Sequence, residues 1–110
     1  MDHEVQVALA QQLEVDTLFT GLLLELQELM GRLVRVEAMW GLVTNAAVID
    51  GLDGRMVAVV LDYDVERVVI VGEEQLRDVV WDVGGDADVL YVQLKQRTVV
   101  FEVVPEVIHG

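Results

Sequence analysis

The periodicity of the apolar residues changes near Gly31, and this change most limits what the chain can fold into. Before Gly31, apolar residues recur at spacings of three and four, which is typical of one face of an amphipathic helix. After it, short valine-rich runs alternate with segments that contain Gly and Asp, which indicates short strands joined by turns. Gly31 itself is expected to end the helix as its C′ residue. The sequence therefore predicts an α+β fold in which an N-terminal helix precedes a sheet.

The helical segment carries an apolar stripe that has two possible uses. The stripe consists of Val15, Phe19, Leu22, Leu26 and Leu29. Packed within one molecule, it would cover one end or one face of the sheet. However, the Leu22-Leu-Leu24 run places apolar side chains nearly all round the helix, and the stripe has heptad-like spacing. We therefore predict that these five residues form a self-association interface.

Two further details of this segment are open or unusual. Residues 5–13 either continue the same helix or form a separate one, with Asp16 or Thr17 as the N-cap between them. Gly21 lies inside the apolar stripe, where glycine costs about 1 kcal/mol relative to alanine. We therefore expect Gly21 to permit the close approach of another backbone.

The part after Gly31 is expected to form six or seven short antiparallel strands at regular spacing. They are predicted over residues 33–39, 42–49, 55–61, 67–71, 75–81, 89–94 and 98–104, and residues 75–81 could instead be a short helical turn. Turns are predicted at residues 40–41, 50–54, 82–88 and 96–97, and Pro105 ends the last strand. This spacing predicts a small antiparallel β-barrel or a strongly bent sheet of about six short strands. Residues 1–110 are expected to form a single domain, helical over 1–30 and β over 32–104.

The charge of the chain disfavours several classes of partner. It contains 20 Asp and Glu against 7 Lys and Arg, which gives a formal net charge of −13. Nucleic acids and anionic membrane surfaces bind through Lys and Arg, so neither is expected as a partner. Hydrophobic residues make up 54% of the 110 residues. Because this is a large apolar load for one small domain, a homo-oligomer is expected to bury part of it.

Other chemistry is limited by what the sequence lacks. There is no cysteine, so disulfides and thiolate metal sites are excluded. The Met-Asp-His-Glu start lacks the basic region of a signal peptide, and no uninterrupted apolar run reaches membrane-spanning length. A cytoplasmic protein without a membrane partner is the default expectation.

One group of carboxylates has the spacing of the ligands in a metal-binding loop. Asp62, Asp64, Glu66 and Glu73 have the spacing of the first, third, fifth and twelfth ligands of a calcium-binding EF-hand loop. However, Arg67 occupies the sixth position, where that loop needs glycine, and the next four residues are apolar and rich in valine. We therefore interpret the acids as the solvent-facing side of a strand end.

The other candidate sites are also interpreted as structural. Asp82, Asp86 and Asp88 surround two glycines, which predicts a turn rather than a calcium site. His3 and His109 lie at opposite ends of the chain, and there is no serine. No catalytic, metal-binding or cofactor-binding residue is predicted, and the chain is not expected to be an enzyme.

The two tryptophans lie at the ends of predicted strands. Trp40 and Trp81 are expected to cover the core rather than to stack against a ligand, although either could anchor a partner.

The order of these elements resembles the layout of Sm-like small β-barrels over about residues 24–81. The resemblance is carried by Gly31, residues 33–37, Gly41, residues 47–50, residues 56–61 and residues 69–72. It implies an N-terminal helix, a five-stranded SH3-like bent sheet, edge-to-edge association, and residues 82–110 as an added hairpin. The RNA pocket of that family does not carry over. Asp50 is followed by Gly54 where Asp-x-x-x-Asn is expected, and Val71-Gly72 replaces Arg-Gly.

Taken together, these features predict a non-enzymatic protein that self-associates as an assembly or adaptor protein, through the apolar helix and through strand edges. Another protein is a possible additional partner. The alternatives are an Sm-like RNA-binding protein and a carboxylate-based protein or enzyme that binds a divalent metal through Asp62, Asp64, Asp86 or Asp88.

Overall fold

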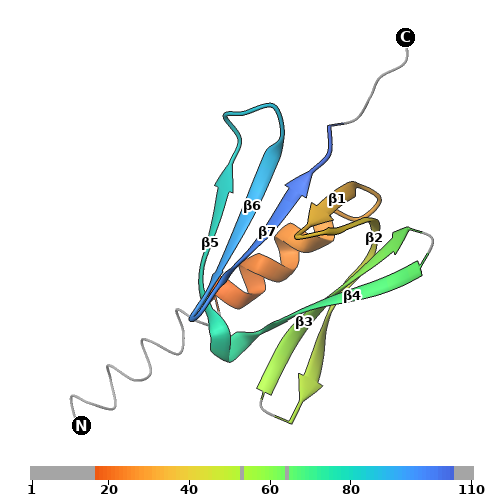
Figure 1. Ribbon diagram of the computed structural model, residues 1–110. Helices are drawn as coiled ribbons and strands as arrows, with labels where there is room; N and C mark the ends of the chain where they lie inside the picture. The colour runs from red at the N-terminus through yellow and green to blue at the C-terminus, as the bar shows by residue number, and fades with distance from the viewer. Residues whose placement is uncertain (1–16, 53, 64, 106–110) are drawn as a thin grey trace, which may run out of the picture.

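The computed structural model describes residues 17–52, 54–63 and 65–105. Residues 17–28 are helical, and the rest of the described chain forms strands and turns. The elements are β1 (Leu33–Val36), β2 (Met39–Gly51), β3 (Gly54–Tyr63), β4 (Val65–Gly72), the 3₁₀ turn η1 (Glu73–Gln75), β5 (Leu76–Asp82), β6 (Asp88–Leu94) and β7 (Thr98–Val103). They form one antiparallel sheet in the order β4-β3-β2-β1-β7-β6-β5 (Figure 1). The predicted α+β class is confirmed.

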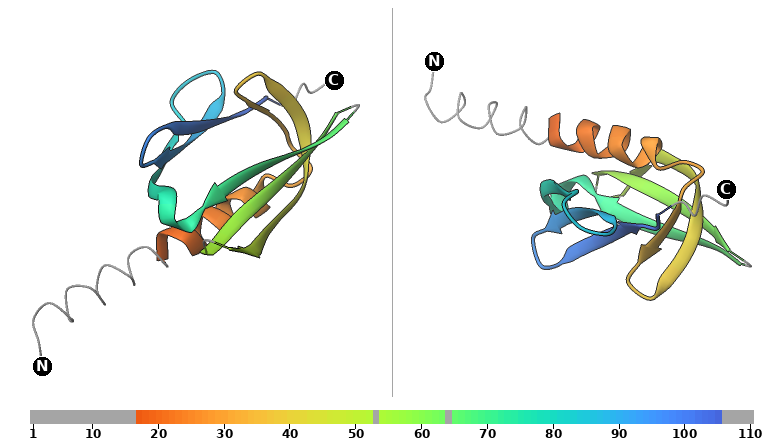
Figure 2. Two further views of the ribbon diagram at one scale, coloured as in Figure 1. Left: turned by 60° about the horizontal axis from the view of Figure 1, so that its bottom comes forward. Right: turned by 90° about the horizontal axis from the view of Figure 1, so that it is seen from above.

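Of the two predicted arrangements, a small barrel or a strongly bent sheet, the barrel is wrong, because the sheet remains open. Its two edge strands, β4 and β5, are consecutive in the chain but are joined by η1 and do not pair with each other. The sheet curls, and the helix lies along one side of it (Figure 2). Because helix side chains contribute to the core, the sheet does not need to bury its inner face by closing on itself. The sheet has seven strands, the upper of the two numbers expected.

The first turn after the helix lies earlier than its sequence indicates. Residues 37 and 38 form the turn between β1 and β2, and Glu37 has a positive φ of 55°. Trp40 and Gly41, where the turn was predicted, are paired within β2 opposite Arg35 and Val34. Residues 75–81, which could have been a strand or a helical turn, divide between η1 and β5.

The core lies between the helix and the inner face of the sheet. The helix contributes Phe19, Leu22, Leu26 and Leu29, and every strand adds at least one buried apolar residue. The largest fully buried side chains are Phe19, Phe101, Leu22, Leu26, Leu61 and Leu90. No polar or charged residue is buried among the described ones. The helix and the sheet therefore share one apolar core.

The end of the helix is attached to β2 by backbone hydrogen bonds. The helix ends at Glu28, earlier than the predicted stop at Gly31, and Met30 already forms a β-bridge with Val43. Gly31 has a φ of +83°, a conformation that glycine adopts without a steric penalty. Its N–H donates to the carbonyl of Val43 over 2.8 Å, and the Val43 N–H donates to the carbonyl of Arg32 over 3.0 Å. The side-chain amide of Gln27 also donates to the carbonyl of Ala46 over 3.2 Å. These bonds fix the helix on the sheet.

A close approach of two backbones occurs at Gly41 and not at Gly21. No atom of the described residues outside the local helix lies within 4 Å of a Cβ built on Gly21, so the expectation for that residue is wrong. By contrast, a Cβ on Gly41 would lie 2.8 Å from the Leu61 Cβ and 3.1 Å from the Asp62 backbone nitrogen.

Alanine substitutions at these two glycines are expected to have opposite effects on the free energy of unfolding. Gly41→Ala should destabilise by about 1–3 kcal/mol, because its Cβ overpacks a backbone contact. Gly21→Ala should stabilise by about 0.5–1 kcal/mol, because alanine loses less entropy in a helix. Urea unfolding of both variants measures the difference. Equal effects of the two substitutions would contradict this explanation.

Candidate functional site

The structure places four of the five stripe residues in the intramolecular core. Phe19, Leu22, Leu26 and Leu29 are buried against the sheet of the same chain. Val15, the fifth residue, lies outside the described residues. The stripe therefore packs within its own molecule, and it offers little apolar surface to a second copy. A self-association surface has to be sought elsewhere.

The carboxylates that have the spacing of a calcium-binding loop do not lie close together in the structure. Asp62 and Glu66 stand opposite each other in the β3–β4 ladder, at the end of that hairpin. Glu73 lies beyond the other end of β4, where it forms an ion pair with Arg55. Strand β4 separates these positions, so the interpretation as a strand end is confirmed. Asp64 lies outside the described residues.

The second group of acids makes a turn, as predicted. An Asp82 carboxylate oxygen accepts a hydrogen bond from the Gly84 N–H over 3.2 Å, and Asp88 begins β6. Within residues 17–52, 54–63 and 65–105, no three His, Cys, Asp or Glu side chains lie close enough together to hold a metal ion. His3 and His109 are outside these ranges.

The two tryptophans have different environments. The Trp81 indole N–H donates to the Glu25 carboxylate over 2.9 Å, and its ring packs against the core, as expected. Trp40 is 46% exposed, so the expectation that it covers the core is wrong. The Arg35 guanidinium lies 5.4 Å from the centre of the Trp40 ring and also pairs with Glu102. Trp40 is therefore available to a partner or ligand.

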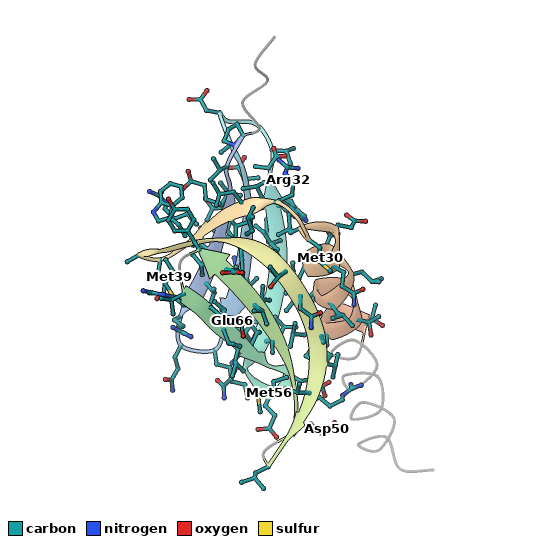
Figure 3. The ribbon with its side chains drawn as sticks, turned by 90° about the vertical axis from the view of Figure 1, so that its right-hand side faces the viewer. Met30, Arg32, Met39, Asp50, Met56 and Glu66 are labelled. Atoms are coloured by element: carbon teal, nitrogen blue, oxygen red, sulfur yellow. The ribbon has the colours of Figure 1, made fainter. Side chains whose placement is uncertain are left out.

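The outer side of β2, β3 and β4 carries no charge over three rows of residues. In the ladder, Asn45, Val60 and Val68 form the first row, Ala47, Ala58 and Ile70 the second, and Ile49, Met56 and Gly72 the third. We call these nine residues the charge-free face. None of them is buried, and Val68 and Ile70 are 50% and 47% exposed. Figure 3 views the molecule from the side on which these strands lie, with Met56 labelled near one end of them.

Charges mark the limits of the charge-free face. Asp62 and Glu66 form the next row of the same three strands, on the same side as Leu42. On the other half of the sheet, the outer side carries Asp78, Asp82 and Glu102 across β5 to β7. The chain as a whole has 27 charged residues among 110. The charge-free face is therefore a distinct region, and it lies on one half of the sheet.

A groove lies at the end of the sheet where the β1–β2 turn meets the β3–β4 hairpin. Its volume is about 560 Å³, and its lining includes Leu33, Met39, Trp40, Tyr63, Val65 and Arg67. Tyr63 and Val65 are 63% and 62% exposed, so the groove opens to solvent with apolar and aromatic walls. Arg67 is the cation in this lining.

Comparison with known proteins found no family model that matches the sequence, no curated protein that matches it and no solved structure that matches the fold. Within the part of the chain that the structure describes, no helix is both long enough and apolar enough to cross a membrane.

Sequence reasoning missed the charge-free face and the groove. The run Val68 to Val71 was interpreted as strand core, whereas Val69 and Val71 are buried and Val68 and Ile70 are exposed. The alternation was hidden because the residues on both sides are apolar. A four-residue stretch such as 68–71, with no polar residue on either side of the strand, is a signal that could have indicated the face.

Proposed function

We propose that this chain is a non-enzymatic protein that self-associates by stacking the charge-free face of one copy on the same face of another. The observation that carries this proposal is the uncharged array of nine exposed or half-buried residues on β2, β3 and β4. In a chain with a formal net charge of −13, solvent exposure alone would favour acids at these positions. Stacking about a twofold axis brings identical patches together, as in most homodimers.

The charge of the protein favours this face for contact with a second copy. Two copies with a formal net charge of −13 each repel one another, so contact requires a region that holds no carboxylate. The charge-free face meets this condition, while the outer side of β5 to β7 does not. The face also reaches the unpaired edge of β4, which lets neighbouring apolar residues add to the contact.

The size of the face predicts a weak association. Strands lie about 4.8 Å apart and side chains on one side recur about every 6.8 Å, so the face measures roughly 15 by 20 Å, or roughly 300 Å². A standard stable interface buries about 800 Å² on each partner. We therefore expect a dimer that dissociates on dilution, with a dissociation constant in the micromolar range or weaker.

Sedimentation velocity and light scattering from micromolar to millimolar concentrations test this proposal. The weight-average mass is expected to rise from that of the 12.3 kDa monomer towards twice that value. A monomer at every concentration would overturn the proposal.

Salt is expected to strengthen the self-association. Increasing the ionic strength from about 0.01 M to about 0.15 M shortens the Debye length from about 30 Å to about 8 Å, which screens the repulsion between two acidic copies. The dissociation constant should fall by roughly three- to tenfold, because the contact itself contains no ion pair that salt would weaken. The same dilution series at two salt concentrations measures this change. A weaker association in salt would instead indicate ion pairs across the contact.

A further inference from the structure

The groove at the end of the sheet combines an open apolar wall with one arginine, Arg67. Arg35, Arg55 and Arg97 each form an ion pair with a glutamate of this chain. Arg67 forms no hydrogen bond or ion pair in the part of the chain that the structure describes. Among the described residues Arg77 and Lys95 likewise form no ion pair, and what distinguishes Arg67 is that it lines the groove.

We propose that this groove binds a small amphiphile that has an apolar body and one carboxylate group. The Arg67 guanidinium would hold the carboxylate through two parallel hydrogen bonds, the arrangement that a planar guanidinium favours. The apolar body would lie against Leu33, Met39 and Val65, between the exposed rings of Trp40 and Tyr63. Binding would thereby satisfy the donor groups of Arg67 and remove exposed apolar surface from water.

The dimensions and the charge of the groove limit the ligand. A volume of about 560 Å³ falls within the range of sites that hold small molecules. Arg67 is the one cation in the described lining of the groove. A second anionic group would find no cationic partner there, so a phosphate ester or a dicarboxylate fits less well than a monocarboxylate.

This site is separate from the charge-free face. Arg67 alternates with Val68 along β4 and therefore lies on the same side of the strand as the buried Val69 and Val71. Val68 and Ile70 lie on the opposite side. Ligand binding and self-association can therefore be tested by different variants.

Titration of the ¹⁵N-labelled full-length chain with octanoate tests the proposal by NMR. The protein has two tryptophans, whose indole N–H signals can be assigned with Trp40→Phe. Octanoate is expected to shift the Trp40 signal, and the Trp81 signal, held by Glu25, should move little. 1-Octanol and octylammonium, which have similar chains but no negative charge, should bind at least roughly tenfold more weakly. Equal binding of the three probes, or no binding of octanoate, would overturn the proposal.

Two arginine variants provide the matched control. Arg67→Gln should weaken octanoate binding by roughly tenfold or more, because the carboxylate loses its charged donor. Arg77→Gln changes the net charge equally but replaces an exposed arginine of β5 outside the groove, so it should leave binding within about twofold. Equal effects of both variants would show only general electrostatics. Tighter binding of an N-acetylated apolar peptide with a free carboxyl end would overturn the assignment to a small amphiphile in favour of a peptide.

Discussion

Ile70→Glu is expected to abolish the self-association of this protein. Ile70 is the middle residue of the charge-free face on β4, opposite Ala58, and it is 47% exposed. In a twofold contact the substitution places two carboxylates within the uncharged interface, where desolvation and repulsion cost several kcal/mol. The dissociation constant should rise by roughly 100-fold or more, which leaves a monomer throughout the dilution series.

Val80→Glu is the matched control for this prediction. Val80 occupies the outer side of β5, the opposite edge strand, opposite Tyr91, and is 40% exposed. The Val80→Glu substitution adds the same charge to a region that already carries Asp78 and Asp82, so the self-association should change little. Ile70→Lys should disrupt the dimer although it lowers the net negative charge, because the cost arises from burying a charge. Equal disruption by Val80→Glu would contradict a contact at the charge-free face.

Leu26→Ala is expected to cause a large loss of stability. Leu26 has 0% exposure and packs in the apolar core, so truncation removes buried methyl groups and leaves a cavity. The expected cost is about 2–5 kcal/mol. Since small domains are stable by about 5–15 kcal/mol, this is a large part of the total.

Leu24→Ala makes the same chemical change in the same helix at a residue that is 56% exposed. It should change the free energy of unfolding by no more than about 0.5 kcal/mol. Urea unfolding monitored by circular dichroism measures both variants. Similar values would show that the helix does not pack on the sheet as described. Neither substitution alters the charge-free face, so the folded fraction of each should still dimerise.

The helix shows how far a periodic pattern can be interpreted. The spacing of Phe19, Leu22, Leu26 and Leu29 correctly placed an apolar stripe on one helix face, because the 3.6-residue period is a property of the backbone. The same pattern could not identify the surface that covers the stripe. A second copy and the chain's own sheet present the same kind of apolar surface. Only the tertiary structure decided for the sheet.

The β1–β2 turn shows a different limit. Gly41 is a strong turn signal in the sequence, yet it lies inside β2 and the turn is formed by residues 37 and 38. Glycine serves at position 41 because a side chain would collide with Leu61 and the Asp62 backbone. That requirement comes from β3, some 20 residues later in the sequence, and no local pattern contains it.

The sequence by itself determined the fold class, the helix, the positions of most strands and the exclusion of cysteine chemistry. These follow from local periodicity, turn residues and composition, which act over a few residues. Only the tertiary structure decided that the sheet stays open, that the helix stripe is internal, and that Arg67 shares a groove with Trp40 and Tyr63. The physical reason is that burial depends on which surfaces meet in space. In strands that are apolar on both sides, the sequence does not distinguish the covered side from the exposed one.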